Sequence, residues 1–402
     1  MQLKHLSLTN YRNFARLDMD LPQGPLLLVG ANGQGKTSLL EAIYYLATFT
    51  SFHAVHDREL VNFLAARESL AVGRIVALFE KDNEQHRLEI RLIKETNGIN
   101  GSSRLRKEIL LGGMKMKIAD AVGQFMAVLF LPQMVEIIEG APEERRRFLN
   151  LAMSQVIHGI NRTLADYAQT LSQRNALLKQ IQEFGGDQDQ LDYWDELLVS
   201  KGSQLIYGRI HTVKELERVA ARNHRELTRG KSILRLSYQP AYDPLPEVPG
   251  QISLPIEDPV DRSGLSVEDI MQGFALRLKE QRSADIARGV TTVGPHRDDL
   301  RFLENGIDLG VYGSRGQVRT AMLSLKMAEM AWMKEVTNYS PVLLLDEALA
   351  ELDPSRREDL LDRLTNNSQT LLTTTDLDLF TPDFVEKATL WRVSDGRVNL
   401  EP

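Results

Sequence analysis

The stretch that decides the fold is GANGQGKT, residues 30–37, which directly follows the apolar run PLLLV at residues 25–29. It matches the pattern G-x-x-x-x-G-K-[ST] without deviation, and apolar residues recur at helical spacing after it. A glycine-rich turn between a strand and a helix directs backbone N–H groups inward, where they and the helix start attract anions. The sequence therefore predicts a phosphate-binding loop. Its predicted residues are Gly30, Ala31, Asn32, Gly33, Gln34, Gly35, Lys36, Thr37 and Ser38.

Two side chains of this loop predict which ligand it holds. The Lys36 ammonium is a compact charge suited to the β- and γ-phosphates of a nucleotide, and we expect a catalytic role for it. The Thr37 hydroxyl is a hard oxygen ligand suited to Mg²⁺. ATP and Mg²⁺ are therefore the expected cofactors. The loop alone fits kinases, GTPases, helicases and transport ATPases equally, so a second motif must separate these classes.

Composition limits the class of protein further. The 402 residues include no cysteine, which excludes disulfides, zinc–thiolate sites and a thiol nucleophile, and suits a reducing cytoplasm. No apolar run approaches the roughly 18–20 residues that span a bilayer, so we expect a cytoplasmic protein without a membrane partner. The net charge of −7 implies that any contact with nucleic acid uses a local basic patch.

The order of patterns along the chain predicts a head interrupted by a helical insertion. We expect the N-terminal part of the head at 1–140, a helical arm or lid at 141–285, and the C-terminal part of the head at 286–402. Two helical stretches flank the glycine pair 185–186 and predict an antiparallel hairpin, with an ordinary helix pair packed on a core as the alternative. Asn305-Gly306 predicts a tight β-hairpin turn.

The second motif is PVLLLDEALAELD, residues 341–353, a buried strand that ends in two acids. In a P-loop site Asp346 would hold Mg²⁺ through water, and Glu347 would polarise the attacking water as a catalytic base. The alternative is a helix-capping pair of acids. A hydrolase needs Glu347 at this position, whereas a small-molecule kinase does not.

The third motif is GSRGQVRT, residues 313–320, at the start of a predicted long helix. Ser314 is a good N-cap residue, and the backbone of Arg315, Gly316 and Gln317 would present N–H donors to a second anion. An ordinary capped helix is the alternative. ATP-binding-cassette heads have the same three motifs in the same order: a phosphate-binding loop, an anion-binding helix start and a strand that ends in acids. The predicted fold class is α/β, an ABC-type P-loop ATPase head with an inserted helical lid or short antiparallel coiled coil.

The chain resembles the RecF family of bacterial ATPases, which are related to the heads of SMC and Rad50 proteins. The resemblance extends over residues 8–353 and rests on eight sequence motifs. They are LTNYRNF, GANGQGKTSLLEAIYYLA, TSFHAVHDREL, FLPQMVEIIEGAPEERRRFLN, LSQRNALLK, TTVGPHRDDL, SRGQVRTAMLSLKMAE and LLLDEALAELD.

The resemblance implies function and partners. It implies an ATP-dependent homodimer with weak, DNA-stimulated ATP hydrolysis that binds double-stranded and gapped DNA. It further implies cooperation with RecR and RecO in loading RecA, and roles in DNA repair, DNA replication and the SOS response. An SMC-like DNA-bound scaffold, whose nucleotide gates dimerisation without significant hydrolysis, is the alternative function. A transporter subunit fits less well, because about 140 residues of paired helices exceed a transporter lobe.

The resemblance also assigns residues. It places Arg12 and Asn13 near the nucleotide phosphates and Gln133 in the loop next to Mg²⁺ and water, as a catalytic residue. It places Ser314 to Gln317 over the ATP of a second subunit and Asp353 in the loop that crosses the dimer seam. The chain departs from the family pattern at a few positions. These are His53, the Gln133-Met134 pair, Asn150, Glu347 and Ala350, and the segment 373–376 has no histidine.

Cations of the insertion are candidates for DNA contact. Arg145, Arg146 and Arg147, with Arg174 and Lys179, put positive charge along the predicted helices. A solvated helix face explains them equally well.

Overall fold

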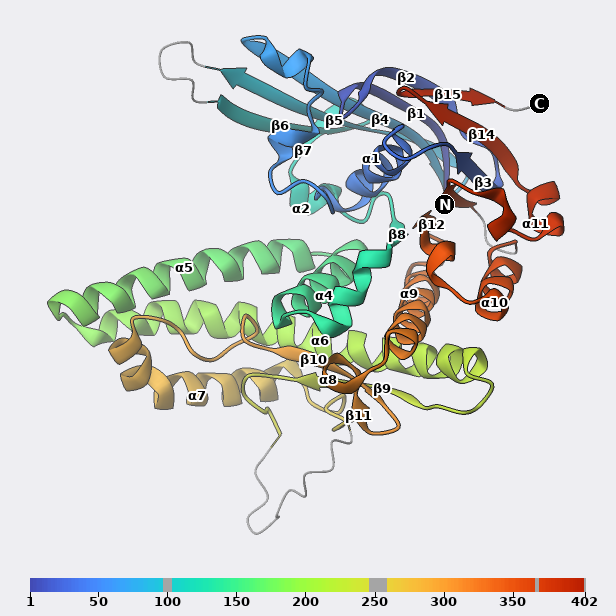
Figure 1. Cartoon of the computed structure of the whole chain (residues 1–402). Coiled ribbons are helices and arrows are strands. Elements are labelled where there is room, and N and C mark those ends of the chain that lie inside the picture. Colours follow the sequence, from blue (N-terminus) through green and yellow to red (C-terminus); the bar gives the residue numbers. More distant parts are fainter. Residues whose placement is uncertain (97–102, 246–258, 366–368, 401–402) are drawn as a thin grey trace. The chain divides into compact units, whose positions relative to one another are not determined.

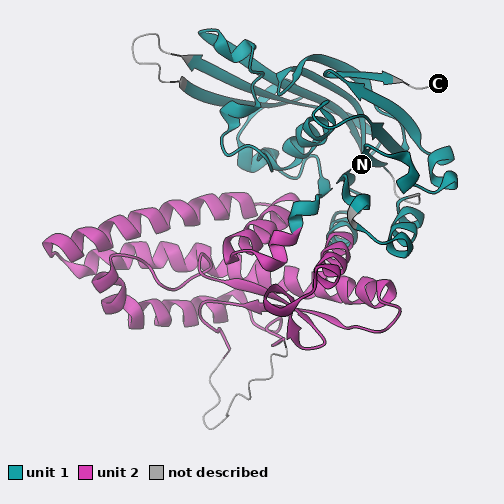
Figure 2. Cartoon of the chain, viewed as in Figure 1, with its two compact units in different colours: residues 1–134, 329–402 teal, residues 135–328 magenta. Residues whose placement is uncertain are grey.

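The computed structural model describes residues 1–96, 103–245, 259–365 and 369–400 (Figure 1). The chain forms two compact units, coloured separately in Figure 2: unit 1 contains 1–134 and 329–402, and unit 2 contains 135–328. Residues 286–328, which the sequence analysis placed with the C-terminal head, thus belong to unit 2. The reason is strand pairing, because a strand that follows residue 285 pairs with one that precedes it.

Unit 1 contains an antiparallel six-stranded sheet of order β2-β1-β4-β5-β6-β7. Its strands are β1 (Gln2–Tyr11), β2 (Phe14–Asp20), β4 (Leu70–Lys81), β5 (Glu84–Thr96), β6 (Ser103–Leu111) and β7 (Met114–Met116). Alternating apolar residues of these strands point to one face and join the core, as the period of a half-buried strand requires. The first two strands form a hairpin, and the whole length of β4 pairs antiparallel with β5.

A second six-stranded sheet in unit 1, of order β15-β14-β3-β13-β12-β8, is parallel except for its last hairpin. Its strands are β3 (Gly24–Val29), β8 (Ala127–Phe130), β12 (Val342–Asp346), β13 (Gln369–Thr374), β14 (Thr389–Ser394) and β15 (Arg397–Leu400). The central strands β3, β13 and β12 are almost wholly buried, and helix α1 (Lys36–Thr48) packs against β12 and β13. This helix also contacts β4, so one hydrophobic core joins both sheets of unit 1.

Short elements complete unit 1 and connect its strands. The helices are α2 (Ile118–Ala121), α10 (Pro354–Thr365) and α11 (Pro382–Lys387), and the 3₁₀ turns are η1 (Asp57–Leu60), η2 (Ala65–Arg67), η5 (Ala348–Glu351) and η6 (Leu377–Leu379). The 3₁₀ turn η3 (Pro132–Val135) and helix α9 (Arg315–Thr337) each contain a point where the chain passes from one unit to the other.

Unit 2 is mainly helical and carries a three-stranded sheet of order β11-β10-β9. Its elements are α3 (Glu136–Glu139), α4 (Pro142–Val156), α5 (Ile160–Phe184), η4 (Gln188–Gln190), α6 (Leu191–Leu227), β9 (Leu234–Gln239), α7 (Val267–Arg288), β10 (Asp299–Glu304), β11 (Ile307–Asp308) and α8 (Leu309–Tyr312). The predicted turn at Asn305-Gly306 joins β10 to β11, and both residues have positive φ, as a type I′ turn requires.

The predicted helical hairpin is present as α5 and α6, but it is not a free arm. Helix α7 packs against both, so the three form a bundle (Figure 1). Gly202 of α6 lies where the helices approach most closely, because a Cβ there would be 2.6 Å from Phe274 and 3.1 Å from Tyr167. The middle of the proline-containing stretch 239–264 lies outside the described residues. None of the helices in the described part of the chain is long and apolar enough to cross a membrane.

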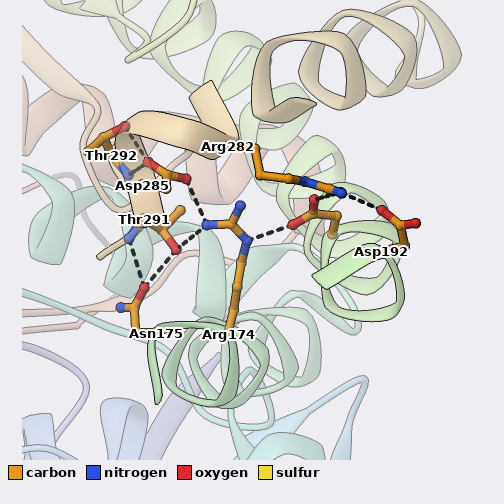
Figure 3. Close-up of polar contacts among 8 residues, drawn as sticks. Arg174, Asn175, Asp192, Arg282, Asp285, Thr291 and Thr292 are labelled. Carbon is orange, nitrogen blue, oxygen red and sulfur yellow. Dashed lines mark hydrogen bonds and ion pairs between the residues drawn. The ribbon is translucent and has the colours of Figure 1, made fainter. Parts of the chain in front are cut away.

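A buried ion-pair network fastens the three helices (Figure 3). Arg174 of α5, whose side chain is fully buried, donates from Nε to Asp195 of α6 at 2.6 Å and from one terminal nitrogen to Asp285 of α7 at 2.8 Å. Asp285 also accepts hydrogen bonds from Thr292, and Arg282 reaches Asp195 from α7. The sequence analysis listed Arg174 among surface cations; that prediction is wrong, because tertiary packing encloses it.

Candidate nucleotide-binding site

The loop 30–37 joins β3 to α1 in the geometry that the motif predicts. Gly33 and Gly35 have φ of 80° and 114°, in the region that favours glycine. A side chain at Gly35 would also meet the Asn13 amide at 2.5 Å. Among the described residues no side chain caps α1, and its first turn carries no acid. Its N–H groups and dipole therefore favour an anion.

Lys36 is almost fully buried, at 4% exposed, and its ammonium is held across the loop. Nζ donates to the carbonyl oxygens of Gly30 at 2.6 Å and Ala31 at 3.1 Å, and lies 3.5 Å from Glu347 Oε1. The loop lysine and the second acid of the β12 motif thus face one another. Two of the three predicted catalytic side chains thus converge, although 311 positions separate them in the sequence.

Asp346 lies at the end of β12 and contacts two hydroxyl groups. Thr37 donates to its carboxylate oxygens at 3.0 and 2.8 Å, and Thr373 donates at 2.6 Å. A hydroxyl and a carboxylate within hydrogen-bond distance are hard oxygen donors of the kind that Mg²⁺ prefers. The residues present therefore fit the predicted magnesium site.

Thr373 was not predicted as a site residue. It stands directly opposite Asp346 in the parallel pairing of β12 and β13, and its hydroxyl also accepts the Glu347 backbone N–H at 3.0 Å. Glu347 has a φ of 49°, which is strained for a residue with a side chain, so this hydrogen bond holds an unfavourable backbone conformation. The threonine run at 373–375, at the carboxyl end of a predicted strand, is the signal that would have found it.

Two hairpin turns donate hydrogen bonds to Gln34 of the phosphate-binding loop. The Asn13 amide donates to the Gln34 carbonyl oxygen at 3.1 Å. From the β14–β15 turn, the Asp395 N–H donates to the Gln34 side chain at 2.6 Å and the Gly396 N–H donates to its carbonyl at 3.3 Å. Asn13 therefore contacts the loop backbone, where it fixes the loop's shape.

Arg12 makes a bidentate ion pair with Glu41 of α1, with both nitrogen–oxygen distances at 2.7 Å. Glu41 is buried and also accepts a hydrogen bond from Ser51. The hydrogen bonds to Glu41 raise the pKa of Arg12 above its ordinary value. For Arg12 to contact a nucleotide phosphate as predicted, its guanidinium would have to leave Glu41 or bind Glu41 and the phosphate together.

The residues predicted in other loops lie at defined places. Gln133 is exposed in η3, three residues after β8, whose end adjoins that of β12. Asp353 accepts a hydrogen bond from the Arg356 N–H at 3.1 Å and so caps helix α10. The sequence analysis predicted a place at the dimer seam for this residue and no capping role. Asn150 accepts a hydrogen bond from Arg209 inside unit 2.

The segment Ser314 to Gln317 forms the exposed start of α9 in unit 2. The Ser314 N–H donates to the Gln317 side chain at 2.9 Å, and the Gln317 N–H donates to Ser314 Oγ at 3.3 Å, which makes a reciprocal cap. The Gln317 amide donates in turn to Glu304 at 2.5 Å, and His224 of α6 contacts the other Glu304 oxygen at 3.0 Å. The cap is thus fixed by a buried acid and a buried histidine.

Comparisons with known proteins agree with this geometry. The DNA replication and repair protein RecF of Chloroflexus aggregans is 39% identical over 409 residues, covering 99% of each chain. A family model described as RecF/RecN/SMC N terminal domain matches residues 2–389. The chain belongs to the RecF family. RecF of Roseiflexus castenholzii is 38% identical over 411 residues, again covering 99% of each chain.

Solved structures give the same result for the fold. A structure of the recombination mediator protein RecF with ATP in the RecFOR pathway matches with a TM-score of 0.83 at 31% identity, covering 100% of this chain and 98% of the other. An Smc head domain from Pyrococcus furiosus matches with a TM-score of 0.52 at 15% identity, which shows a shared fold alone. The RecF-family chain therefore has the predicted α/β ABC-type head with an inserted helical domain.

Proposed function

We propose that this RecF-family protein is an ATP-gated DNA clamp of replication and repair, which closes as a homodimer on ATP and reopens on hydrolysis. The observation that carries the proposal is the convergence of Lys36, Thr37, Asp346 and Glu347 at one end of the parallel sheet. This arrangement binds a nucleoside triphosphate and supplies an acid next to it. The titles of the related RecF structures, which name ATP, support the choice of nucleotide.

The chain's own residues account for binding and hydrolysis. The loop N–H groups and Lys36 would hold the phosphates, and Thr37 and Asp346 would hold Mg²⁺. Bound Mg²⁺ would neutralise phosphate charge. Glu347, whose backbone is anchored by Thr373, would accept a proton from the attacking water. Gln133 would lie beside that water.

A second predicted anion-binding segment, outside the phosphate loop, supports the proposal of dimerisation. The exposed, capped helix start Ser314 to Gln317 presents N–H donors that belong to a different unit from the phosphate loop. We propose that it covers the nucleotide of a second copy, with Asp353 near the seam. The names of the relatives, which mention DNA replication and repair and the RecFOR pathway, support a role with DNA, RecR and RecO. Binding of double-stranded and gapped DNA, and help in loading RecA, are proposed from the family resemblance.

Light scattering of the full chain with and without ATP tests the proposal. We expect ATP to convert wild type to a dimer, and both Lys36→Arg and Ser314→Arg to remain monomeric. Ser172→Arg, an exposed serine of α5, is the matched control and should dimerise normally. Dimerisation of both site variants on ATP would overturn the mechanism.

Glu347→Gln separates the clamp from a scaffold whose nucleotide is structural. In a clamp this variant should retain the ATP dimer while hydrolysis falls about 100-fold or more, so that DNA is released slowly. Release of DNA at the wild-type rate would favour the scaffold.

A further inference from the structure

The outer face of the antiparallel sheet in unit 1 carries an unusual arrangement of charge. On β5 the core-facing residues Leu88, Ile90 and Leu92 are fully buried. Because successive side chains of a strand alternate between faces, Arg87, Glu89 and Arg91 lie on the opposite face. The inward-facing apolar side chains pack in the core, whereas packing does not explain the outward-facing charges.

Glu89 is the centre of this arrangement and is only 1% exposed. Its two carboxylate oxygens accept bonds from three arginines on two strands: Arg74 at 2.8 Å, Arg87 at 2.7 Å and Arg91 at 2.7 Å. One negative charge therefore lies beneath three positive ones.

Glu108 of β6 repeats the pattern next to it. Its side chain is 11% exposed, and it contacts Lys115 at 2.8 Å, Arg106 at 3.5 Å and Arg91 at 3.9 Å. Both clusters share Arg91, so five cations and two carboxylates form one connected set with a net charge of +3. The five cations are 38–69% exposed. The acids lie below and the cations above, so solvent meets a positive surface on a protein of net charge −7.

The strand register makes this surface costly for the fold. Arg74 stands directly opposite Arg91 in the pairing of β4 and β5, and like charges in opposed positions destabilise a sheet. The buried carboxylate of Glu89 offsets that repulsion. A sheet face selected for stability alone would place polar or opposite charges at these two positions.

We propose that this face, defined by Arg74, Arg87, Arg91, Arg106 and Lys115, binds the phosphodiester backbone of a nucleic acid duplex. The inference rests on the proposed DNA clamp and gives it a contact surface. Four of the five cations are arginines, whose planar forks bind phosphate oxygens through two parallel hydrogen bonds.

The dimensions of the face favour a polymer over a single anion. The residues extend over β4 to β7, three strand spacings or about 14 Å, and from Arg87 to Arg91 over about 13 Å of strand. A duplex carries one charge per ~1.7 Å of axis on its two strands together, so a 14 Å length holds roughly eight phosphates, several of which would face the sheet. A single phosphate would need a cradle, whereas these side chains lie on a sheet. Contact through phosphates alone predicts binding with little sequence preference.

The rival surface on the insertion is weaker. Arg145 is bound to Asp299 and Arg146 donates to the Asp298 carbonyl, both within unit 2. Arg174 is fully enclosed by the helix bundle. These three of the five candidate cations serve the fold, and only Arg147 and Lys179 are exposed, against five exposed cations on the sheet face.

Binding of a fluorescein-labelled duplex of about 30 base pairs, followed by anisotropy over a salt series with ATP present, tests the inference. The variant Arg87→Gln, Arg106→Gln and Lys115→Gln removes three charges but leaves Arg74 and Arg91 on Glu89, so that the buried acid stays paired. The control Lys231→Gln, Lys279→Gln and Lys334→Gln removes three exposed charges elsewhere. Glu108→Gln makes the face more positive.

We expect the sheet variant to lose roughly tenfold or more in affinity, and its salt dependence to fall by about 0.9 in log–log slope for each lost contact. The control should stay within about twofold of wild type, and Glu108→Gln should bind about two- to threefold more tightly. Equal affinity of wild type and sheet variant overturns the inference and leaves the clamp standing. Binding of poly-glutamate is measured in the same way. If the sheet variant loses affinity for poly-glutamate but not for the duplex, the face binds an acidic protein and the inference is wrong. If wild type itself binds no duplex, the clamp proposal fails as well.

Discussion

Thr37 Oγ1 lies 2.8 Å from Asp346 Oδ2 and 3.0 Å from Oδ1, so the start of helix α1 contacts both carboxylate oxygens at the end of β12. The two residues are 309 positions apart in the sequence. Their contact joins the phosphate-binding loop to the acidic end of β12, and it brings together the two protein ligands that a magnesium ion would use. The first prediction tests this pair directly.

Replacing Thr37 by valine should weaken magnesium-dependent nucleotide binding. Valine has nearly the shape of threonine but lacks the hydroxyl oxygen, so we expect the gain in ATP affinity on adding Mg²⁺ to fall about tenfold, or ~1.4 kcal/mol. The measurement is the Kd of a fluorescent ATP analogue with Mg²⁺ and with EDTA. Thr37→Ser keeps the hydroxyl and should resemble wild type. An unchanged magnesium effect in the valine variant would show that Thr37 is not a ligand.

Thr373 is predicted to be a positioning residue for hydrolysis. Thr373→Val removes the acceptor of the Glu347 N–H and one donor to Asp346, each loss costing about 1–3 kcal/mol where the groups are buried. We expect kcat for ATP hydrolysis to fall about tenfold or more with KM within about twofold. Steady-state kinetics measure kcat and KM separately. Thr373→Ser keeps the hydroxyl and should have a kcat close to that of wild type. A rise in KM at constant kcat would assign Thr373 to binding instead.

The sequence predicted the parts of the site whose signal is local. The loop 30–37 and the acid pair at 346–347 are contiguous patterns, and the adjoining apolar runs predict two buried strands. These strands, β3 and β12, lie on either side of β13 in the parallel sheet. The role of Thr373 depended on the register of β12 and β13, which no single segment encodes. The pairing of Arg12 with Glu41 likewise joins a turn to a helix 29 residues later.

Arg174 illustrates a signal that was present and misinterpreted. It lies three residues after Leu171 and four before Leu178, which places it on the apolar stripe of α5 by helical spacing. Charge alone suggested a surface residue. The periodicity indicated burial, and burial of an arginine requires acids from neighbouring helices, here Asp195 and Asp285.

Removal of that arginine should destabilise unit 2 severely. Arg174→Met leaves Asp285 buried without its cation, and we expect a loss of about 3–5 kcal/mol in the free energy of unfolding. Urea denaturation followed by circular dichroism measures it. The matched control is Arg277→Met on α7, whose partner Glu280 is also exposed, and it should change stability by less than about 0.5 kcal/mol. Similar losses in the two variants would mean that the network contributes no more than a surface pair.

Glu89 predicts a pH dependence of stability. The hydrogen bond from Arg74, followed by that from Arg91, lowers the pKa of Glu89 from 4.5 to about 2. A carboxyl whose pKa is lower in the folded chain stabilises it above pH ~4.5, and this contribution disappears as the pH falls toward 2.

Glu89→Gln should therefore cost about 2 kcal/mol at pH 7, an amount reduced by solvent around the half-exposed arginines. The difference from wild type should shrink as the pH falls below about 4.5 and be smallest near pH 2, because first the unfolded and then the folded wild-type chain protonates Glu89. Urea denaturation of both proteins at pH 7, 5 and 3 measures the trend. Glu196→Gln, an exposed acid of α6, should differ from wild type by less than about 0.5 kcal/mol at each pH. A Glu89→Gln deficit that stays constant from pH 7 to pH 3 would show that shape and hydrogen bonding, and not the charge beneath the arginines, make Glu89 important.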